Sequence, residues 1–207
     1  MCVKSQPLFS SDAIIENDMG WVVPQYSRDK VDAAGWVLAK SKSAEASNPS
    51  DQPLEDALVV INNWRASHNF PLNTFQIGLR TRAKQIDQKS LVAQRIKRLP
   101  AIRHKLRIMG KWISLSQIQD IGGCRAVVSN PGHVYDLVEN YKKSDIKHKL
   151  EKMSDYMREP KGSGYRGVHM VYRYFSDRSK TYNGLQIEIQ IRSPLQHAWA
   201  TAVAQAC

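Results

Sequence analysis

Polar and apolar side chains alternate in the segment 185–192, LQIEIQIR. An alternation with period two predicts a half-buried strand. Glu188, Gln190 and Arg192 would then project from one face, about 7 Å apart at neighbouring positions. A carboxylate, an amide and a guanidinium on one surface suit a charged ligand, but the pattern equally fits the solvated face of an antiparallel sheet. The segment alone leaves both interpretations open.

A second carboxylate, Asp120, precedes the turn Ile121-Gly122-Gly123, which leads Arg125 into another apolar segment. If the strand of Glu188 pairs near Arg125, the two carboxylates could share a magnesium ion with phosphate oxygens, an arrangement that Mg²⁺ commonly adopts. Taken singly, either acid would more often be an ordinary surface or capping group. The pairing of the strands must therefore decide.

The segment 160–169, PKGSGYRGVH, combines cations, glycines and aromatic rings. Lys161 and Arg166 could meet phosphates, Tyr165 could stack on a base, and His169 could hydrogen-bond a ribose or a phosphate. The alternative is a turn whose Tyr and His only pack. His197, in the segment after Pro194, is on general grounds expected to be a core histidine with its hydrogen bonds satisfied. The sequence contains no Walker loop, no dinucleotide-binding glycine motif and no Ser/His/Asp triad.

The chain has 207 residues, of which 42% are hydrophobic and 24% charged, as expected of one globular domain or of a domain with an extension. No apolar run approaches the roughly 18 residues of a membrane span, and the acidic N-terminus lacks a signal-peptide pattern. We therefore expect a soluble cytoplasmic protein with no membrane partner. The 3 cysteines are far apart, which argues against disulfides and a structural zinc.

The net charge of +11 is concentrated in one part of the chain. Residues 78–112 hold 11 Lys/Arg and 1 Asp/Glu, and we call this segment the basic block. A positive field focused in this way attracts polyphosphates or nucleic acid, although a solvated helical surface would also explain it.

The Ser-rich segment 40–52 predicts a linker that separates an N-terminal accessory arm, 1–52, from a domain over 53–207. Helices are expected from about Pro53 to Trp64, from about Asn73 onward, and from Pro100 to Gly110, so the basic block would lie on two or three helices. Strands are expected over 125–129, 167–175 and 185–192, with helices over 132–143 and from Pro194. This order predicts an α+β fold with a small mixed sheet flanked by helices and a helical N-terminal extension.

Four segments in this order, RTRAK, QDIGGCRAVV, PKGSGYRGVH and EIQIRSPLQHAWA, resemble the synthetase domain of the RelA/SpoT family. The similarity spans roughly residues 74–203 and is greatest to small alarmone synthetases and their toxic, tRNA-modifying relatives. It implies a nucleotidyltransferase-like fold. It also implies transfer of the β,γ-pyrophosphate of ATP to a 3′-hydroxyl, either of GDP or GTP to give (p)ppGpp, or of the 3′-CCA end of tRNA.

By position, the resemblance makes Asp120 and Glu188 the catalytic and Mg²⁺-binding acids. The residues it assigns to ATP are Arg80, Arg82, Lys84, Arg95, Lys97, Arg98 and Arg125. The residues it assigns to the acceptor are Lys161, Tyr165, Arg166, His169, Gln190, Arg192 and His197.

Two departures from the family pattern stand out. Two extra residues lie between Lys84 and Ser90, so the phosphate contact within 95–98 is left open, and the acidic residue expected after Val203 is missing, which predicts a truncated terminal helix. The acceptor also stays open, as do an antitoxin or a second copy of the chain as partner. A non-catalytic RNA-binding module, which would need neither carboxylate, is the alternative from another functional class.

Overall fold

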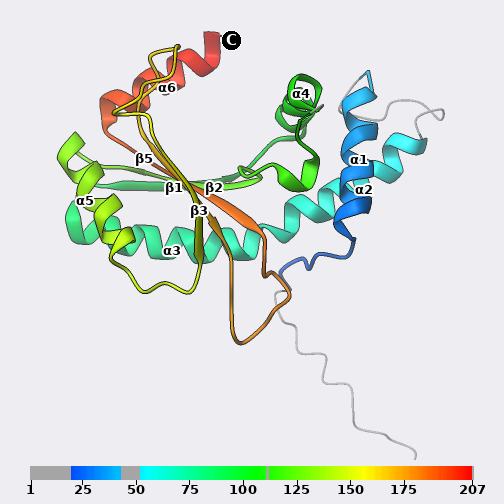
Figure 1. Ribbon diagram of the computed structural model, residues 1–207, viewed down its shortest axis with the longest axis horizontal. Coiled ribbons are helices and arrows are strands. Elements are labelled where there is room, and N and C mark those ends of the chain that lie inside the picture. The colour runs from blue at the N-terminus through cyan, green and yellow to red at the C-terminus, as the bar shows by residue number, and fades with distance from the viewer. Residues whose placement is uncertain (1–19, 43–51, 111, 207) are drawn as a thin grey trace, which may run out of the picture.

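The computed structural model describes residues 20–42, 52–110 and 112–206. Most of the expected linker, together with Cys2 and Cys207, lies outside them. Helices and strands alternate irregularly along the chain (Figure 1). The elements are α1 (Arg28–Lys40), α2 (Gln52–Ser67), α3 (Asn69–Ile86), β1 (Leu91–Ile96), α4 (Leu99–Met109), the short 3₁₀ helix η2 (Leu115–Gln117), β2 (Gly122–Val127), α5 (Pro131–Lys142), β3 (Lys149–Asp155), β4 (Val168–Arg173), β5 (Gln186–Arg192) and α6 (Pro194–Ala206).

The five strands form one mixed sheet in the order β1-β2-β5-β4-β3. Only β2 and β5 pair in parallel; the other neighbours are antiparallel. Gly123 lies opposite Glu188, and Arg125 lies opposite Gln190. The expected α+β fold is confirmed, and the strand of Glu188 does pair with that of Arg125.

Two of the five strands, β1 and β3, were not expected from the sequence. Both are edge strands, and most of their side chains are exposed. Because an edge strand with two exposed faces needs no apolar alternation, LVAQRI and KLEKMSD carry no strand signal. The interpretation of the basic block as wholly helical is therefore wrong, since its middle is strand β1.

The start of α3 also differs from the expectation. The helix begins at Asn69 rather than Asn73, and Pro71 lies within its first turn. Proline is tolerated there because the first N–H groups of a helix have no intrahelical partner. The segment SHNFP therefore starts a helix directly after α2 has ended at Ser67.

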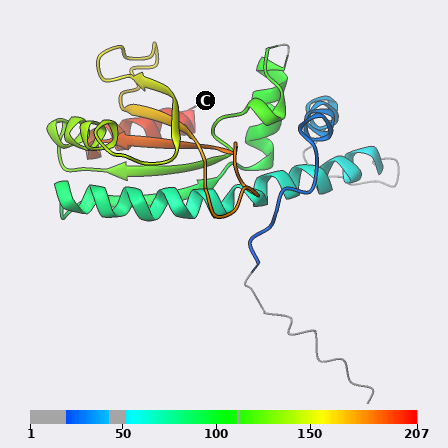
Figure 2. The ribbon, with the colours of Figure 1, turned by 60° about the horizontal axis from the view of Figure 1, so that its bottom comes forward.

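The sheet has one apolar and one polar face. Ile187, Ile189 and Ile191 of β5 are fully buried. Helix α3 runs beneath them (Figure 2), with its Phe75 ring 5.7 Å from Tyr172 of β4. Because Tyr172 pairs with Ile187, both side chains project from the face that α3 covers. Glu188 and Gln190 consequently project from the other face.

Helix α1 packs on α2 and α4 (Figure 1), and Val31, Ala34 and Leu38 are buried in the same core as the sheet. The close approach of η2 requires a glycine, because a Cβ at Gly35 would lie 2.6 Å from Leu115 Cβ. The helical N-terminal extension is thus part of the packed structure. The boundary at residue 52 stays a prediction.

Helix α6 begins where expected, and its start is a capping box. Ser193 N donates to Gln196 Oε1 at 2.8 Å, and Gln196 N donates to Ser193 Oγ at 3.5 Å. This fixes the direction in which α6 leaves β5. His197 and Trp199 are therefore held near the end of the polar face.

Two further findings bear on the compositional predictions. Within the described ranges, no helix combines the length and apolarity needed to cross a membrane. Cys124 is a free, buried thiol, and burial raises its pKa to about 12, so it stays protonated.

Candidate active site

Asp120 and Glu188 border one cleft of about 550 Å³ on the polar face of the sheet. The cleft lies between α4 with the segment after it, the strands β3, β4 and β5, and the loop between β3 and β4. The same two carboxylates also border a smaller hollow of about 60 Å³, together with Arg95, Arg125 and Gln190. The pairing of β2 with β5 is what brings the two acids together.

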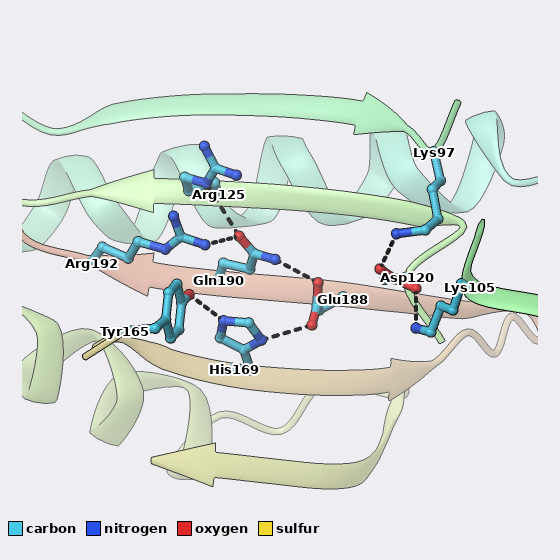
Figure 3. Close-up of polar contacts among 9 residues, drawn as sticks. All are labelled: Lys97, Lys105, Asp120, Arg125, Tyr165, His169, Glu188, Gln190 and Arg192. Carbon is cyan, nitrogen blue, oxygen red and sulfur yellow. Dashed lines mark hydrogen bonds and ion pairs between the residues drawn. The ribbon is translucent and has the colours of Figure 1, made fainter. Parts of the chain in front are cut away.

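Both carboxylate oxygens of Glu188 accept hydrogen bonds from neighbouring strand residues (Figure 3). His169 Nδ1 lies 2.8 Å from Oε1, and Gln190 Nε2 donates to Oε2 at 2.6 Å. Gln190 Oε1 in turn accepts from Arg125 Nε at 3.2 Å and from Arg192 Nη2 at 2.5 Å. Glu188 is therefore held in place by a polar network on the sheet.

The network also keeps Glu188 ionised. Burial favours the neutral acid, but the hydrogen bonds that Glu188 accepts from His169 and Gln190 outweigh it, so the pKa of Glu188 lies below its usual value. The nearby charge of Asp120 acts in the opposite direction. A carboxylate that remains charged can bind a cation or accept a proton.

Asp120 is held by two lysines instead. Lys97 Nζ lies 2.6 Å from Oδ2, and Lys105 Nζ lies 2.8 Å from Oδ1. Burial again opposes ionisation, but the charges and hydrogen bonds of the lysines lower the pKa of Asp120 overall. Lys97 reaches this position because its backbone N–H donates to Ile121 O at 2.8 Å, directly after the acid.

Lys105 is a site residue that the sequence reasoning missed. The signal that could have identified it is the helical spacing of the buried residues of α4, Ile102 and Leu106. Residue 105 follows Ile102 by three positions, so it borders the buried stripe rather than the exposed face.

Arg125 connects the sheet with α6. Its Nη1 lies 3.5 Å from His197 Nδ1. Burial and the neighbouring cations Arg125 and Arg192 lower the pKa of His197, so this imidazole is neutral at pH 7. Arg95 is exposed on β1 and borders the small hollow with Arg125.

Lys161 and Tyr165 lie on the loop between β3 and β4. The Tyr165 ring lies between two cations, Lys161 Nζ at 5.2 Å and Arg192 Cζ at 4.8 Å from its centroid. Arg166 donates to Met157 O at 3.2 Å, within its own loop, and it borders neither hollow.

Trp199 of α6 holds this loop. Its Nε1 donates to Ser163 O at 3.2 Å, and Gly164, at φ +74°, leaves room for the indole, since a Cβ there would lie 3.3 Å from the ring. The sequence alone assigned no role to Trp199. Only the three-dimensional approach of α6 to the loop identifies it as a contact.

The α3 part of the basic block borders neither hollow, and the assignment of Arg80, Arg82 and Lys84 to ATP stays a prediction. Arg82 Nη1 donates to Asn140 Oδ1 at 2.7 Å, and Arg82 lies 5.0 Å from the Tyr141 ring centroid, between α3 and α5 beneath the sheet. Lys84 Nζ donates to Gln88 O at 2.5 Å, and Arg80 is exposed on α3. Arg98 is exposed at the N-cap of α4.

The two acids fit a divalent cation only if a substrate completes its coordination. In the part of the chain that the structure describes, no three His, Cys, Asp or Glu side chains are grouped as a metal site. Mg²⁺, however, commonly uses one or two carboxylates together with substrate phosphates. Two ionised carboxylates beside the same hollow meet that requirement.

Comparison with known proteins agrees with the geometry. Residues 94–206 match the family described as "Region found in RelA / SpoT proteins". The match begins at Gln94, so Arg80, Arg82 and Lys84 precede it. Over 111 residues the chain is 30% identical to the GTP pyrophosphokinase YwaC of Bacillus subtilis, an alignment that covers 52% of each protein. The chain thus spans about half the length of this curated relative.

Solved structures show the same fold. Small alarmone synthetase 1 of Bacillus subtilis, bound to its product pppGpp, has a TM-score of 0.59 at 22% identity and is matched over 67% of this chain and 75% of that one. Small alarmone synthetase 2 of the same organism gives 0.60 at 23%, over 70% and 78%. A GTP pyrophosphokinase family protein of Streptococcus pneumoniae gives 0.57 at 27%, over 66% and 70%.

Proposed function

The chain belongs to the RelA/SpoT family, and from that premise we propose that it is an ATP-dependent pyrophosphokinase that acts on GDP or GTP. The observation that carries the proposal is the pair of ionised carboxylates, Asp120 and Glu188, in one cleft among cationic side chains. Transfer of a phosphoryl-type group depends on charge neutralisation and positioning more than on covalent help from the protein. This site offers both.

In the proposed reaction, the acceptor 3′-oxygen forms a bond to the β-phosphorus of ATP. The bond from that phosphorus to the α,β-bridging oxygen breaks, and AMP leaves with the bonding electron pair. Glu188 accepts the hydroxyl proton as general base. Its fixed hydrogen bonds keep it deprotonated and oriented for this task.

The triphosphate binds to Lys97, Lys105, Arg95 and Arg125. Arg95 of β1 and Arg125 of β2 border the small hollow, and Lys105 of α4 borders the cleft. Lys97, which follows β1, contacts Asp120 directly. Lys97 and Lys105 now neutralise Asp120, and phosphate oxygens would take over these ammonium groups. Asp120 and Glu188 would then hold Mg²⁺, which when bound neutralises charge on the transferred pyrophosphate.

The acceptor binds on the other side of Glu188. Tyr165 offers an aromatic ring for the guanine base, and Lys161, His169 and Arg192 surround that ring. The relative bound to pppGpp supports a guanosine nucleotide as acceptor.

The test incubates the protein with ATP, Mg²⁺ and either GDP or GTP, and measures AMP and a new, more highly phosphorylated guanosine nucleotide. Equal amounts of both products are expected, and both should disappear when Mg²⁺ is chelated. If ATP binds but neither product forms, the proposed function is wrong.

The 3′-CCA end of tRNA is a second candidate acceptor. One observation favours it, which is that α4 and the residues after it expose Arg98, Arg107 and Trp112 to solvent, Trp112 with 84% of its surface exposed. Other residues of the same segment, Lys105, Met109 and Ile113, border the cleft. Cations and an exposed aromatic ring suit single-stranded RNA. Labelled ATP offered to guanosine nucleotides and to tRNA side by side separates the two acceptors. An antitoxin or self-oligomer as partner and a cytoplasmic location stay predictions.

A further inference from the structure

Building on the proposed function, we infer that the Tyr165 hydroxyl is a positioning group for Glu188. The Tyr165 ring, which receives the acceptor base, is connected through His169 to the carboxylate that accepts the acceptor's proton. Tyr165 thus has two separable tasks, with stacking done by its ring and orientation of Glu188 done by its hydroxyl.

The connection is a continuous chain of hydrogen bonds (Figure 3). The Tyr165 hydroxyl contacts His169 Nε2, and the opposite ring nitrogen, Nδ1, contacts Glu188 Oε1 at 2.8 Å. His169 pairs with Gln190 across β4 and β5, so its backbone position is set by the sheet. Its ring orientation is set by the loop through Tyr165.

A second arm holds the other oxygen of Glu188. Arg192 donates to Gln190 Oε1, and Gln190 Nε2 donates to Glu188 Oε2 at 2.6 Å. The Arg192 guanidinium also lies 4.8 Å from the centroid of the Tyr165 ring. Both arms therefore run from Arg192 and Tyr165 to one carboxylate, and that carboxylate cannot rotate without breaking one of them.

The direction of each hydrogen bond in the Tyr165 arm follows from the chemistry of the groups. An ionised carboxylate only accepts, so His169 Nδ1 must carry the proton. In the neutral imidazole, Nε2 is then an acceptor, and the Tyr165 hydroxyl donates to it. Burial raises the pKa of Tyr165, which keeps the hydroxyl protonated and able to donate. The hydroxyl thereby selects the tautomer of His169 that faces Glu188.

Without this hydroxyl, His169 could carry its proton on either ring nitrogen. With a proton on Nε2 instead, His169 would present the lone pair of Nδ1 to Glu188, and the hydrogen bond that orients this carboxylate would be lost. The other charged groups near Glu188 would remain. They are Asp120 before β2, Arg125 on β2, Arg192 on β5, and the cleft lysines Lys105, Lys152 and Lys161.

The test replaces Tyr165 by Phe, which keeps the ring. We expect the KM for the acceptor to change less than about twofold, and kcat to fall by roughly 10-fold, the lower end of the usual effect of an orienting partner.

Tyr156→Phe is the matched control. The Tyr156 ring lies edge-on to both Tyr165 and His169, with centroids 5.8 and 5.2 Å away, so the substitution removes a hydroxyl from the same aromatic cluster. It should leave kcat within about twofold of the parent. His169→Gln should lower kcat as well, and adding Tyr165→Phe to it should cost little more, because both act through one connection.

The ¹⁵N shifts of His169 provide a readout that does not depend on turnover. The parent should show a protonated Nδ1, and Tyr165→Phe should shift signal toward the other tautomer. If the parent makes no AMP, the proposed function falls, and the shifts alone decide whether the hydroxyl selects the tautomer. If the parent is active and Tyr165→Phe keeps its kcat, or raises only the acceptor KM, the inference is wrong.

Discussion

The two faces of strand β5 hold their side chains by different means. On one face, Ile187, Ile189 and Ile191 are fully buried among aromatic residues of α3 and β4. On the other, Glu188 and Gln190 are part-buried and held by directional hydrogen bonds. Dispersion and burial stabilise the first face, whereas the second offers charge and orientation.

The basic block divides between the same two faces. Lys97 and Lys105 reach Asp120 on the polar face, whereas Arg82 lies between α3 and α5 on the apolar side. Cations that are close together in sequence therefore have different roles: Lys97 and Lys105 bind a carboxylate of the site, whereas Arg82 connects two helices. Substitutions on one face should change turnover without unfolding the protein, and substitutions on the other should do the reverse.

The largest effect is expected for Glu188→Gln. The amide keeps the shape and can still accept one of the two hydrogen bonds, but it removes the charge, so AMP formation should fall by about 10²–10⁴-fold, the usual worth of a general base. The melting temperature should change little, because the isoleucines of the other face supply the packing. Unchanged turnover would support the alternative that this face of β5 is only the solvated side of the sheet. It would also favour an RNA-binding module.

Gln186→Ala is the control for this experiment. Gln186 lies on the same face of β5 but donates to Glu151 Oε2 at 3.2 Å, at the far end of the strand. Turnover should stay within about twofold of the parent. A loss as large as that of Glu188→Gln would mean that the whole strand face, not the acid, is sensitive to substitution.

How far the sequence predicted this division depends on the kind of signal. The alternation of β5 and the Ser193-Pro194 helix start are local, and both were predicted correctly. The resemblance named Lys97 and Arg82 together, because it assigns residues by motif position and does not specify a face of the sheet. The phase of α4 places Lys105 beside the buried stripe, but its contact with Asp120 is tertiary, and so is that of Trp199 with Ser163.

A smaller but still clear effect is expected for Lys105→Met. The substitution keeps the apolar stem and removes one of the two cations near the Asp120 carboxylate, so the ATP concentration needed for half-maximal rate should rise by roughly 10-fold, as for the loss of one charge-assisted contact. The pKa of Asp120 should rise, since Lys105 helps to lower it. Turnover should therefore fall off at a higher pH on acidification than in the parent.

His104→Ala, at an exposed neighbouring position of α4, is the control for Lys105→Met. It should leave the ATP requirement unchanged. If both substitutions raised the requirement slightly and equally, and steeply with salt, α4 would act as a diffuse polyanion platform rather than as a phosphate-binding element.

The smallest effect on activity is expected for Arg82→Ala. Arg82 gives up a hydrogen bond to Asn140 Oδ1 and a cation–π contact with Tyr141, which together stabilise the fold by about 1–2 kcal/mol. The melting temperature should fall by roughly 2–8 °C for a chain of this size. The ATP requirement of the folded protein should not change, because α3 lies across the sheet from Asp120 and Glu188.

Asn140→Ala removes the same hydrogen bond from its other end, so it should reproduce part of the loss in stability, and the double variant should lose less than the sum of the two. A strong rise in the ATP requirement for Arg82→Ala, with an unchanged melting temperature, would mean that the α3 cations bind the ATP phosphates. It would contradict the division of the basic block between the two faces.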